Sequence, residues 1–240
     1  MNKAKFKDLR IFIRLKSEGG LKGKKVMITP DFSREEKLIK KGYKYIAGVD
    51  EAGRGPLAGP VVAAAVVFSN GKAINELIRK GVRDSKMLSS KKREYFYELI
   101  IEQSCDWAAY DVSEEIIDKI NILQATKLAM RKALEKLKNA PDFLLIDGIN
   151  TIDDFPASQI AIPKADQSVF SVSAASIIAK VTRDRILSDL DKIYPGYGFA
   201  AHKGYGTKFH MEMIRKLGPC KIHRKSFGPI VKALSKLKIV

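Results

Sequence analysis

The sequence is poor in cysteine and has no long apolar run. Its 240 residues include two cysteines, Cys105 and Cys220, which lie far apart and outside any Cys-x-x-Cys or Cys/His cluster. This pattern argues against a disulfide framework and gives no zinc motif, so we expect two reduced thiols. No run of about 18 apolar residues is present, and residues 1–25 carry many Lys and Arg instead of the apolar core of a signal peptide. We therefore expect a cytoplasmic protein that does not bind membranes.

Positive charge is abundant, and it is concentrated at both ends of the chain. The formal net charge is +17 at pH 7. Residues 1–44 hold 14 Lys and Arg against 5 Asp and Glu, residues 45–200 hold 20 against 21, and residues 201–240 hold 10 against 1. A nearly neutral body between basic flanks is typical of an enzyme that acts on a polyanion. A basic surface that serves only solubility would give the same pattern.

Strand and helix patterns alternate along the middle of the chain. Apolar runs predict strands over 45–51, 61–68, 106–112, 143–147 and 159–162, and helical spacing predicts helices over 31–41, 89–103, 113–138 and 173–190. A further short helix is expected to end near Gly19, and the last forty residues are expected to be helical or irregular. This alternation predicts an α/β body.

Three carboxylates, Asp50, Glu51 and Asp147, stand where predicted strands end. Carboxylates that converge at one sheet edge repel one another, so such a group favours a bound cation, and Mg²⁺ or Mn²⁺ suits oxygen ligands. Because consecutive strand residues face opposite ways, Asp50 and Glu51 reach one site only if the strand ends there. An isolated Asp-Glu pair is otherwise a solvated strand end.

The turn after Glu51 contains Gly53, Arg54 and Gly55. It is not a dinucleotide-binding loop, because position 58 is Ala and a strand follows, and it lacks the Gly-Lys-Ser/Thr of a phosphate-binding P-loop. Glycines here favour a close approach of backbone amides to a polyanion, with Arg54 as a phosphate partner, although a tight loop needs glycines too. The three histidines show no metal-ligand spacing, and we expect them to contact phosphate or to lie exposed on the surface; they are His202, His210 and His223.

Five separated motifs then resemble one known family in their content and order. They are Gly48–Pro60, Asp84–Lys86, Leu145–Gly148, Ala174–Asp184 and His202–Thr207. Together they resemble bacterial ribonuclease HII over about residues 42–230. The sister family, ribonuclease HIII, fits less well, because it typically lacks Gly-Arg-Gly and has a larger N-terminal domain than 44 residues supply.

The resemblance implies a ribonuclease H-like fold, with a mixed central sheet flanked by helices and a C-terminal helical appendage. On this basis we expect a basic N-terminal extension over 1–44, a catalytic domain over 45–195 and a basic helical region over 196–240. We expect a monomer, and the sequence identifies no protein partner.

The resemblance also implies the site. Its four catalytic and metal-binding carboxylates correspond to Asp50, Glu51, Asp147 and Asp166, which would hold two Mg²⁺ or Mn²⁺ ions. Spacing alone would not have separated Asp166 from other aspartates such as Asp142, Asp153, Asp154 and Asp184. The expected substrate-binding residues are Gly53, Arg54, Gly55, Ser85, Lys86, Ser173 and Tyr205.

The activity implied by the resemblance is endonucleolytic. The enzyme would hydrolyse the RNA strand of RNA/DNA hybrids and nick duplex DNA on the 5′ side of an embedded ribonucleotide, leaving a 3′-OH and a 5′-phosphate. Two alternatives stay open: another nuclease built on a carboxylate cluster, and a basic RNA/DNA-binding protein whose carboxylates are structural.

Overall fold

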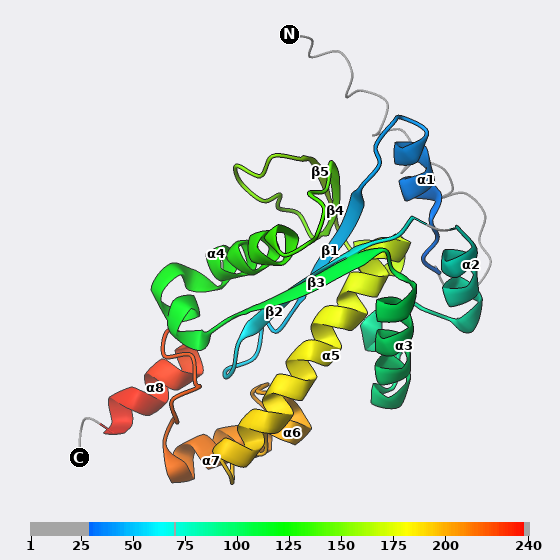
Figure 1. The fold of residues 1–240 in the computed structure, drawn as a ribbon. Coiled ribbons are helices and arrows are strands. Elements are labelled where there is room, and N and C mark those ends of the chain that lie inside the picture. Colours follow the sequence, from blue (N-terminus) through cyan, green and yellow to red (C-terminus); the bar gives the residue numbers. More distant parts are fainter. Residues whose placement is uncertain (1–28, 70, 238–240) are drawn as a thin grey trace, which may run out of the picture.

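A mixed five-stranded sheet forms the centre of the molecule. The structure is a computed structural model, and it describes residues 29–69 and 71–237 (Figure 1). The strands are β1 (Ile46–Ala52), β2 (Val61–Val67), β3 (Asp106–Val112), β4 (Phe143–Asp147) and β5 (Ser158–Ile162), in the spatial order β3-β2-β1-β4-β5. The β1–β2 and β2–β3 pairs are antiparallel, whereas β4 runs parallel to both β1 and β5.

Helices cover both faces of this sheet. Helix α4 (Glu114–Glu135) packs on one face, and α5 (Phe170–Ile193) packs on the other beside α2 (Gly71–Lys80) and α3 (Ser90–Gln103) (Figure 1). The C-terminal region adds α6 (Phe199–His202), α7 (Lys208–Leu217) and α8 (Gly228–Leu237). Two 3₁₀ turns, η2 (Ser85–Met87) and η3 (Ala165–Gln167), complete the described elements. None of the described helices has the length and apolarity to cross a bilayer.

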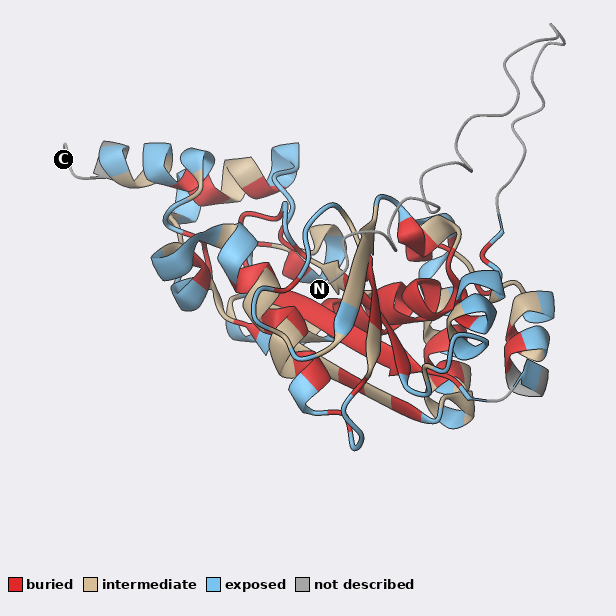
Figure 2. Cartoon of the chain, turned by 90° about the horizontal axis from the view of Figure 1, so that it is seen from above, coloured by how far each residue is buried: buried red, intermediate tan, exposed pale blue. Residues whose placement is uncertain are grey.

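The core explains why the sheet and α5 are held so tightly together. Every residue of β2 is buried, and its side chains alternate between the α4 face and the α5 face (Figure 2). Helix α5 approaches β1 so closely that a Cβ on Gly48 would lie 2.2 Å from the backbone carbon of Ser171. A glycine at position 48 therefore lets the first turn of α5 reach the strand that carries Asp50.

Most expected elements are confirmed, with three corrections. Strand β1 does not end at Glu51 but continues to Ala52. Helix α4 is broken at Asn121, whose φ of 66° is non-helical and whose side chain accepts hydrogen bonds from the next helical amides. Helix α2 was not expected from the sequence at all. The helix expected to end near Gly19 lies outside the described residues.

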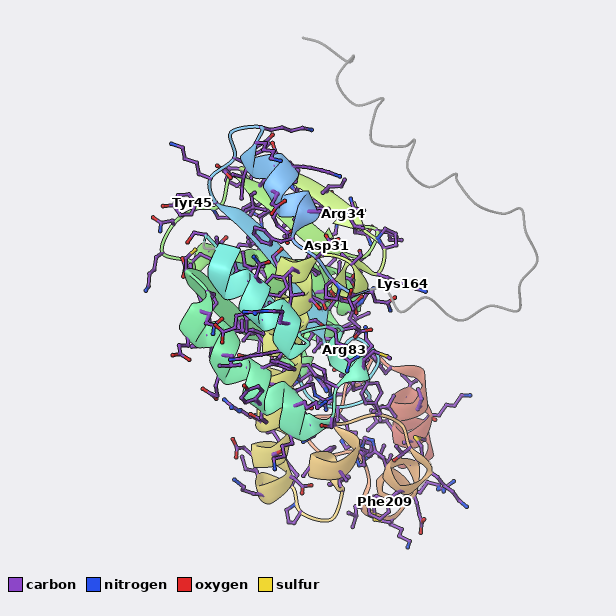
Figure 3. All side chains as sticks on the ribbon, turned by 90° about the vertical axis from the view of Figure 1, so that its right-hand side faces the viewer. Asp31, Arg34, Tyr45, Arg83, Lys164 and Phe209 are labelled. Carbon is purple, nitrogen blue, oxygen red and sulfur yellow. The ribbon has the colours of Figure 1, made fainter. Side chains whose placement is uncertain are left out.

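Part of the segment before β1 packs against the start of α5. Helix α1 (Ser33–Ile39) buries Glu35, whose Oε1 accepts hydrogen bonds from the backbone amide and the hydroxyl of Ser171 at 2.9 and 2.7 Å. The Phe170 amide donates to the Asp31 carbonyl at 2.9 Å. Residues 31–35 thus satisfy amides at the open end of α5. Asp31 and Arg34 mark this end of the molecule, and Phe209 on α7 lies at the other (Figure 3).

Candidate active site

Three aspartates converge at the ends of two neighbouring parallel strands. Asp50 and Asp147 each follow a paired position, Val49 opposite Ile146, so they lie side by side on β1 and β4. Asp166 comes from η3, immediately before α5. One carboxylate oxygen from each aspartate lies within 4.8 Å of the others. Among the described residues this is the one group of His, Cys, Asp and Glu side chains spaced to share a metal ion.

Burial and mutual repulsion disfavour the charged forms of these carboxylates. Burial raises the pKa of Asp50 well above its ordinary value, and the charges of Glu51 and Asp147 raise it further. The pKa of Asp147 is raised for the same reasons, by burial and then by the charge of Asp166. A divalent cation would relieve both penalties at once, because it replaces lost hydration and neutralises the repulsion.

Glu51 is close to this group but does not join it. Because β1 stays regular through Ala52, Asp50 faces α5 and Glu51 faces the opposite side of the sheet. The Glu51 carboxylate instead pairs with the Arg54 guanidinium at 3.2 Å. Burial raises the pKa of Glu51, and Arg54 opposes that shift. The structure therefore gathers three of the four expected carboxylates and places the fourth beside the glycine turn.

Lys86 supplies the positive charge nearest to the aspartates. Its Nζ donates to Asp166 Oδ2 at 2.9 Å, although most of the lysine side chain is exposed. Partial burial lowers the pKa of Lys86, but the hydrogen bond and charge of Asp166 outweigh it and raise that pKa above its usual range. An exposed cation tethered at the site is suited to contact a phosphate.

The two expected serine contacts lie below the surface. Ser85 is buried, and its hydroxyl is hydrogen-bonded to that of Ser176 at 2.9 Å. Ser173 is fully buried and donates to the Asp166 carbonyl at 2.9 Å. These positions do not support direct phosphate contacts; instead, Ser85 holds η2 and Ser173 holds η3 against α5. Sequence reasoning missed Ser176, which hydrogen-bonds to Asp50; its place one turn after Ser173 on the same helix face was the available signal.

The glycine turn and Tyr205 are brought together, as expected for parts of one site. A Cβ on Gly55 would lie 3.7 Å from Tyr205 Cε1, so the ring stands next to this residue. Arg54 and Tyr205 are both exposed. Gly53 has a φ of +99°, and a Cβ there would overlap the side chain of Arg183. Only glycine fits this position, because both the backbone angle and the space exclude a side chain.

The histidines also gather, but through hydrogen bonds. His210 Nε2 and His223 Nε2 are 3.0 Å apart, and the His202 ring stacks on that of His210 with centroids 4.2 Å apart. His210 Nδ1 contacts the Tyr205 carbonyl at 2.9 Å. The expected surface position is wrong for His210 and His223, which are buried at 0% and 1% exposure because they pair with each other beneath the Tyr205 loop.

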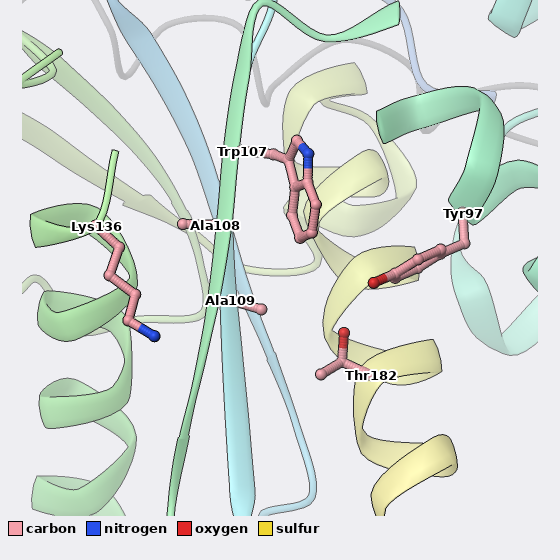
Figure 4. Close-up of a pocket in the computed structure, with 6 residues that line it drawn as sticks. All are labelled: Tyr97, Trp107, Ala108, Ala109, Lys136 and Thr182. Carbon is pink, nitrogen blue, oxygen red and sulfur yellow. The ribbon is translucent and has the colours of Figure 1, made fainter. Parts of the chain in front are cut away.

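A hollow of about 450 Å³ beside β3 offers no competing catalytic centre. It contains no carboxylate and is lined by Tyr97, Trp107, Ala108, Ala109, Lys136 and Thr182 (Figure 4). The chemistry of the described chain is therefore concentrated at the aspartates.

Comparison with known proteins adds the family to this geometry. The model of the ribonuclease HII family matches residues 47–229. The chain belongs to the ribonuclease HII family. It is therefore a metal-dependent ribonuclease H, which excludes a protein that only binds nucleic acid, and it contains a carboxylate cluster. Ribonuclease HII of Caldicellulosiruptor saccharolyticus is 50% identical over 196 residues, which cover 82% of this chain and 93% of the relative.

Solved structures of related enzymes share the fold. Ribonuclease H2 from Pyrococcus horikoshii OT3 superposes with a TM-score of 0.69 at 31% identity, covering 81% of this chain and 99% of that one. The Bst ribonuclease HIII solved in complex with Mn²⁺ has a TM-score of 0.60 at 22% identity, covering 82% of this chain and 71% of that one, and shows likeness of fold alone. The expected ribonuclease H-like architecture is thereby confirmed.

Proposed function

We propose that this ribonuclease H is an endonuclease that cuts the RNA strand of RNA/DNA hybrids and nicks duplex DNA on the 5′ side of an embedded ribonucleotide. The products would be a 3′-OH and a 5′-phosphate. The observation that carries the proposal is that a group suited to bind metal lies next to a surface suited to recognise ribose. A three-aspartate cluster suited to phosphodiester hydrolysis is joined through the Glu51–Arg54 pair to an exposed glycine turn and Tyr205.

The carboxylates would hold divalent cations. Asp50, Asp147 and Asp166 fit one ion directly, and Glu51, which is nearby but paired with Arg54, would complete a second site. Mg²⁺ or Mn²⁺ suits this all-oxygen set, and the Mn²⁺ complex of the structurally similar Bst enzyme is consistent with it. When bound, two such ions activate the attacking water and stabilise the leaving oxygen.

The glycine turn and Tyr205 would recognise the ribose. RNA and DNA differ at a given nucleotide by the 2′-OH, so selectivity requires a group that tests it. The Arg54 and Gly55 amides donate to no other backbone group among the described residues, and Gly55 has no side chain to block access, so these amides are suited to hydrogen-bond a 2′-OH. The exposed ring of Tyr205 beside Gly55 is placed to stack on the adjacent deoxyribose. Lys86 would contact a phosphate near the cut.

A covalently closed DNA circle with a single ribonucleotide tests the proposal. The enzyme with Mg²⁺ is expected to convert it to the nicked form, whereas the same circle without a ribonucleotide should stay closed. An exonuclease would leave both circles intact because neither has an end. Failure to nick, nicking without a divalent metal, or equal nicking of both circles would overturn the proposed function.

A further inference from the structure

Two arginines are buried in the middle of the proposed recognition region. Arg183 is 1% exposed and Arg224 is not exposed at all, and neither takes part in a salt bridge among the described residues. Burial lowers the pKa of Arg224 to about 9. An unpaired cation is expensive to remove from water unless other dipoles replace its hydration. Such an arrangement demands a reason in the fold or in the function.

The guanidinium of Arg224 is surrounded by carbonyl oxygens from the glycine turn. Its Nη2 donates to Gly53 O at 2.6 Å, its Nη1 donates to Arg54 O at 3.0 Å and to Pro56 O at 2.8 Å, and its Nε donates to Gly59 O at 3.0 Å. One side chain thus holds four carbonyls of a loop that lies about 170 residues away in sequence. The planar fork of an arginine can do this, whereas the single ammonium of a lysine cannot.

These contacts fix the direction of two backbone amides. The Gly53 carbonyl shares a peptide unit with the Arg54 amide, and the Arg54 carbonyl shares one with the Gly55 amide. The described chain has no cis peptide bond, so each N–H points away from its own carbonyl. Because both carbonyls point inward to Arg224, both amides point outward, toward the side on which Arg54 and Gly55 are exposed. Within the described residues, neither amide donates to another backbone group.

The segment that carries Arg224, residues 220–224, also holds the Tyr205 loop through two histidines. The Cys220 amide donates to His223 Nδ1 at 2.9 Å, which leaves the His223 proton on Nε2. That proton is donated to His210 Nε2 at 3.0 Å, and His210 in turn donates from Nδ1 to the Tyr205 carbonyl at 2.9 Å. His223 immediately precedes Arg224. The carbonyls of the glycine turn and of Tyr205 are therefore both anchored to residues 220–224.

Backbone contacts tie the two loops directly as well. The Leu57 amide donates to the Gly204 carbonyl at 2.8 Å, and the Arg224 amide donates to the Leu57 carbonyl at 2.9 Å. A Cβ on Gly204 would lie 2.5 Å from the Ala58 carbonyl oxygen, so the loops touch at this point. The glycine turn, the Tyr205 loop and residues 220–224 therefore form one hydrogen-bonded unit.

We propose that Arg224 is a positioning residue for ribose recognition, which turns the Arg54 and Gly55 amides toward the nucleic acid and holds them in register with Tyr205. This inference rests on the proposed function, because it assumes that the glycine turn tests the 2′-OH. Arg224 itself does not touch the substrate. It removes the freedom of the turn before binding, so the recognition contacts need no rearrangement.

The test measures discrimination, which we define as the ratio of the dissociation constant for an all-DNA duplex to that for the same duplex with one ribonucleotide. Fluorescence anisotropy with Mg²⁺ supplies both constants in the Asp50→Asn background, which we expect to bind without cutting. The test variant is Arg224→Lys, which keeps the charge but loses the fork. The matched control is Arg131→Lys, because Arg131 also holds loop carbonyls, those of Asp153 and Asp154, but outside the recognition region.

Arg224→Lys is expected to lower discrimination about tenfold by weakening binding of the ribonucleotide duplex, as expected for misplaced amide hydrogen bonds, with little change for the all-DNA duplex. Arg131→Lys should keep the discrimination, because the carbonyls that Arg131 holds lie outside the recognition region. Unchanged discrimination in Arg224→Lys, or an equal loss in both variants, would overturn the inference. No discrimination in the Asp50→Asn parent would instead count against the proposed function.

A second measurement does not depend on how well Arg224→Lys folds. In the Asp50→Asn protein labelled with ¹⁵N, the ribonucleotide duplex should shift the Arg54 and Gly55 amide signals, and the all-DNA duplex should shift them much less. Equal responses to the two duplexes, or no response, would show that these amides do not read the ribose and would overturn the role given to Arg224.

Discussion

The aspartate cluster and the two buried arginines each bring like charges together inside the protein, but the fold stabilises them differently. Around Arg183 and Arg224, backbone carbonyls accept seven guanidinium hydrogen bonds. Around Asp50, Asp147 and Asp166, burial and repulsion are relieved only in part, by hydrogen bonds from the Glu51 and Ala165 amides and by Lys86.

This difference suits the two arginines to hold loops in place and the aspartates to bind metal. A charge group that the backbone already solvates needs no ligand, and it can hold a loop still. A group of like charges whose repulsion is only partly relieved is stabilised when a cation binds. The aspartates are therefore the group that favours metal binding. Buried charges of one sign therefore serve a structural role where backbone groups solvate them, and favour metal binding where they do not.

Removing one carboxylate of the aspartate cluster should have the largest effect on activity. We expect Asp50→Asn to lower metal-dependent cleavage by about three orders of magnitude, since several kcal/mol of transition-state stabilisation are lost. Without metal, the thermal unfolding midpoint should not fall, because the substitution removes a repelled charge. Asp153→Asn is the matched control, since Asp153 is exposed and pairs with Lys127. Near-normal cleavage by Asp50→Asn would remove the aspartate cluster from the chemistry.

Truncating Tyr205 should have a smaller and more selective effect. Tyr205→Ala is expected to lower kcat/KM on a single-ribonucleotide duplex about tenfold to a hundredfold, because the stacking surface beside Gly55 is lost. The Mg²⁺ concentration that gives half-maximal activity should hardly change. Phe209→Ala serves as a control, since Phe209 is an equally exposed aromatic residue on α7. Equal losses in the two variants would argue against a specific role for Tyr205.

The basic N-terminal segment provides a test of charge that does not involve the site. Deleting residues 1–28, which stops short of the packed residues 31–35, should leave kcat intact while reducing the dependence of binding on salt. The reason is that fewer counterions are released when fewer cations meet phosphates. Plots of log Kd against log salt for the full and shortened chains check this. Parallel plots would mean that the segment does not contact nucleic acid.

The buried pair of His210 and His223 should make the stability of the protein fall at acid pH. Burial lowers the pKa of His210 and His223 to about 4, each opposed by a backbone hydrogen bond and assisted by a neighbouring His. A depressed histidine pKa means that the unfolded chain binds more protons, so stability is lost as pH falls from about 6.5 to about 4. In His223→Gln, we expect this loss of unfolding free energy to shrink by about 1–2 kcal/mol.

Denaturant unfolding at pH 7 and pH 5 measures this effect. The control is His202→Gln, because His202 is partly exposed and stacks on His210 without joining the bond between the two buried rings. An identical pH dependence in the parent and in His223→Gln would show that the pair does not govern acid stability.

Sequence reasoning found the parts of this protein whose signals are local. Apolar runs marked the strands, and the positions of Asp50 and Asp147 near their ends marked the sheet edge at which the three aspartates meet. Asp166 needed the family resemblance, because nothing in its neighbourhood distinguishes it from other aspartates. The position of Glu51 was harder to predict, because side chains alternate between the two faces of β1. A strand that ended at Glu51 would have let it join Asp50, but β1 continues regularly to Ala52 and places Glu51 on the other face.

The role proposed for Arg224 had no local signal. Its neighbours in sequence show only a basic tail, and its partners are backbone carbonyls, which every residue carries. Such contacts depend on the path of the chain rather than on side-chain types, so no motif in residues 53–60 identifies the arginine that holds them. The same holds for the histidines, whose pairing follows from the way α7 meets residues 220–224.

The central claim is metal-dependent cleavage on the 5′ side of a ribonucleotide embedded in DNA. The most direct measurement uses an end-labelled duplex with one ribonucleotide, incubated with and without Mg²⁺, and maps the product to nucleotide resolution. We predict one cut, at the phosphodiester bond on the 5′ side of the ribonucleotide, that leaves a 3′-OH and appears only with metal. A cut on the 3′ side, scattered cuts, or cleavage without metal would contradict the account.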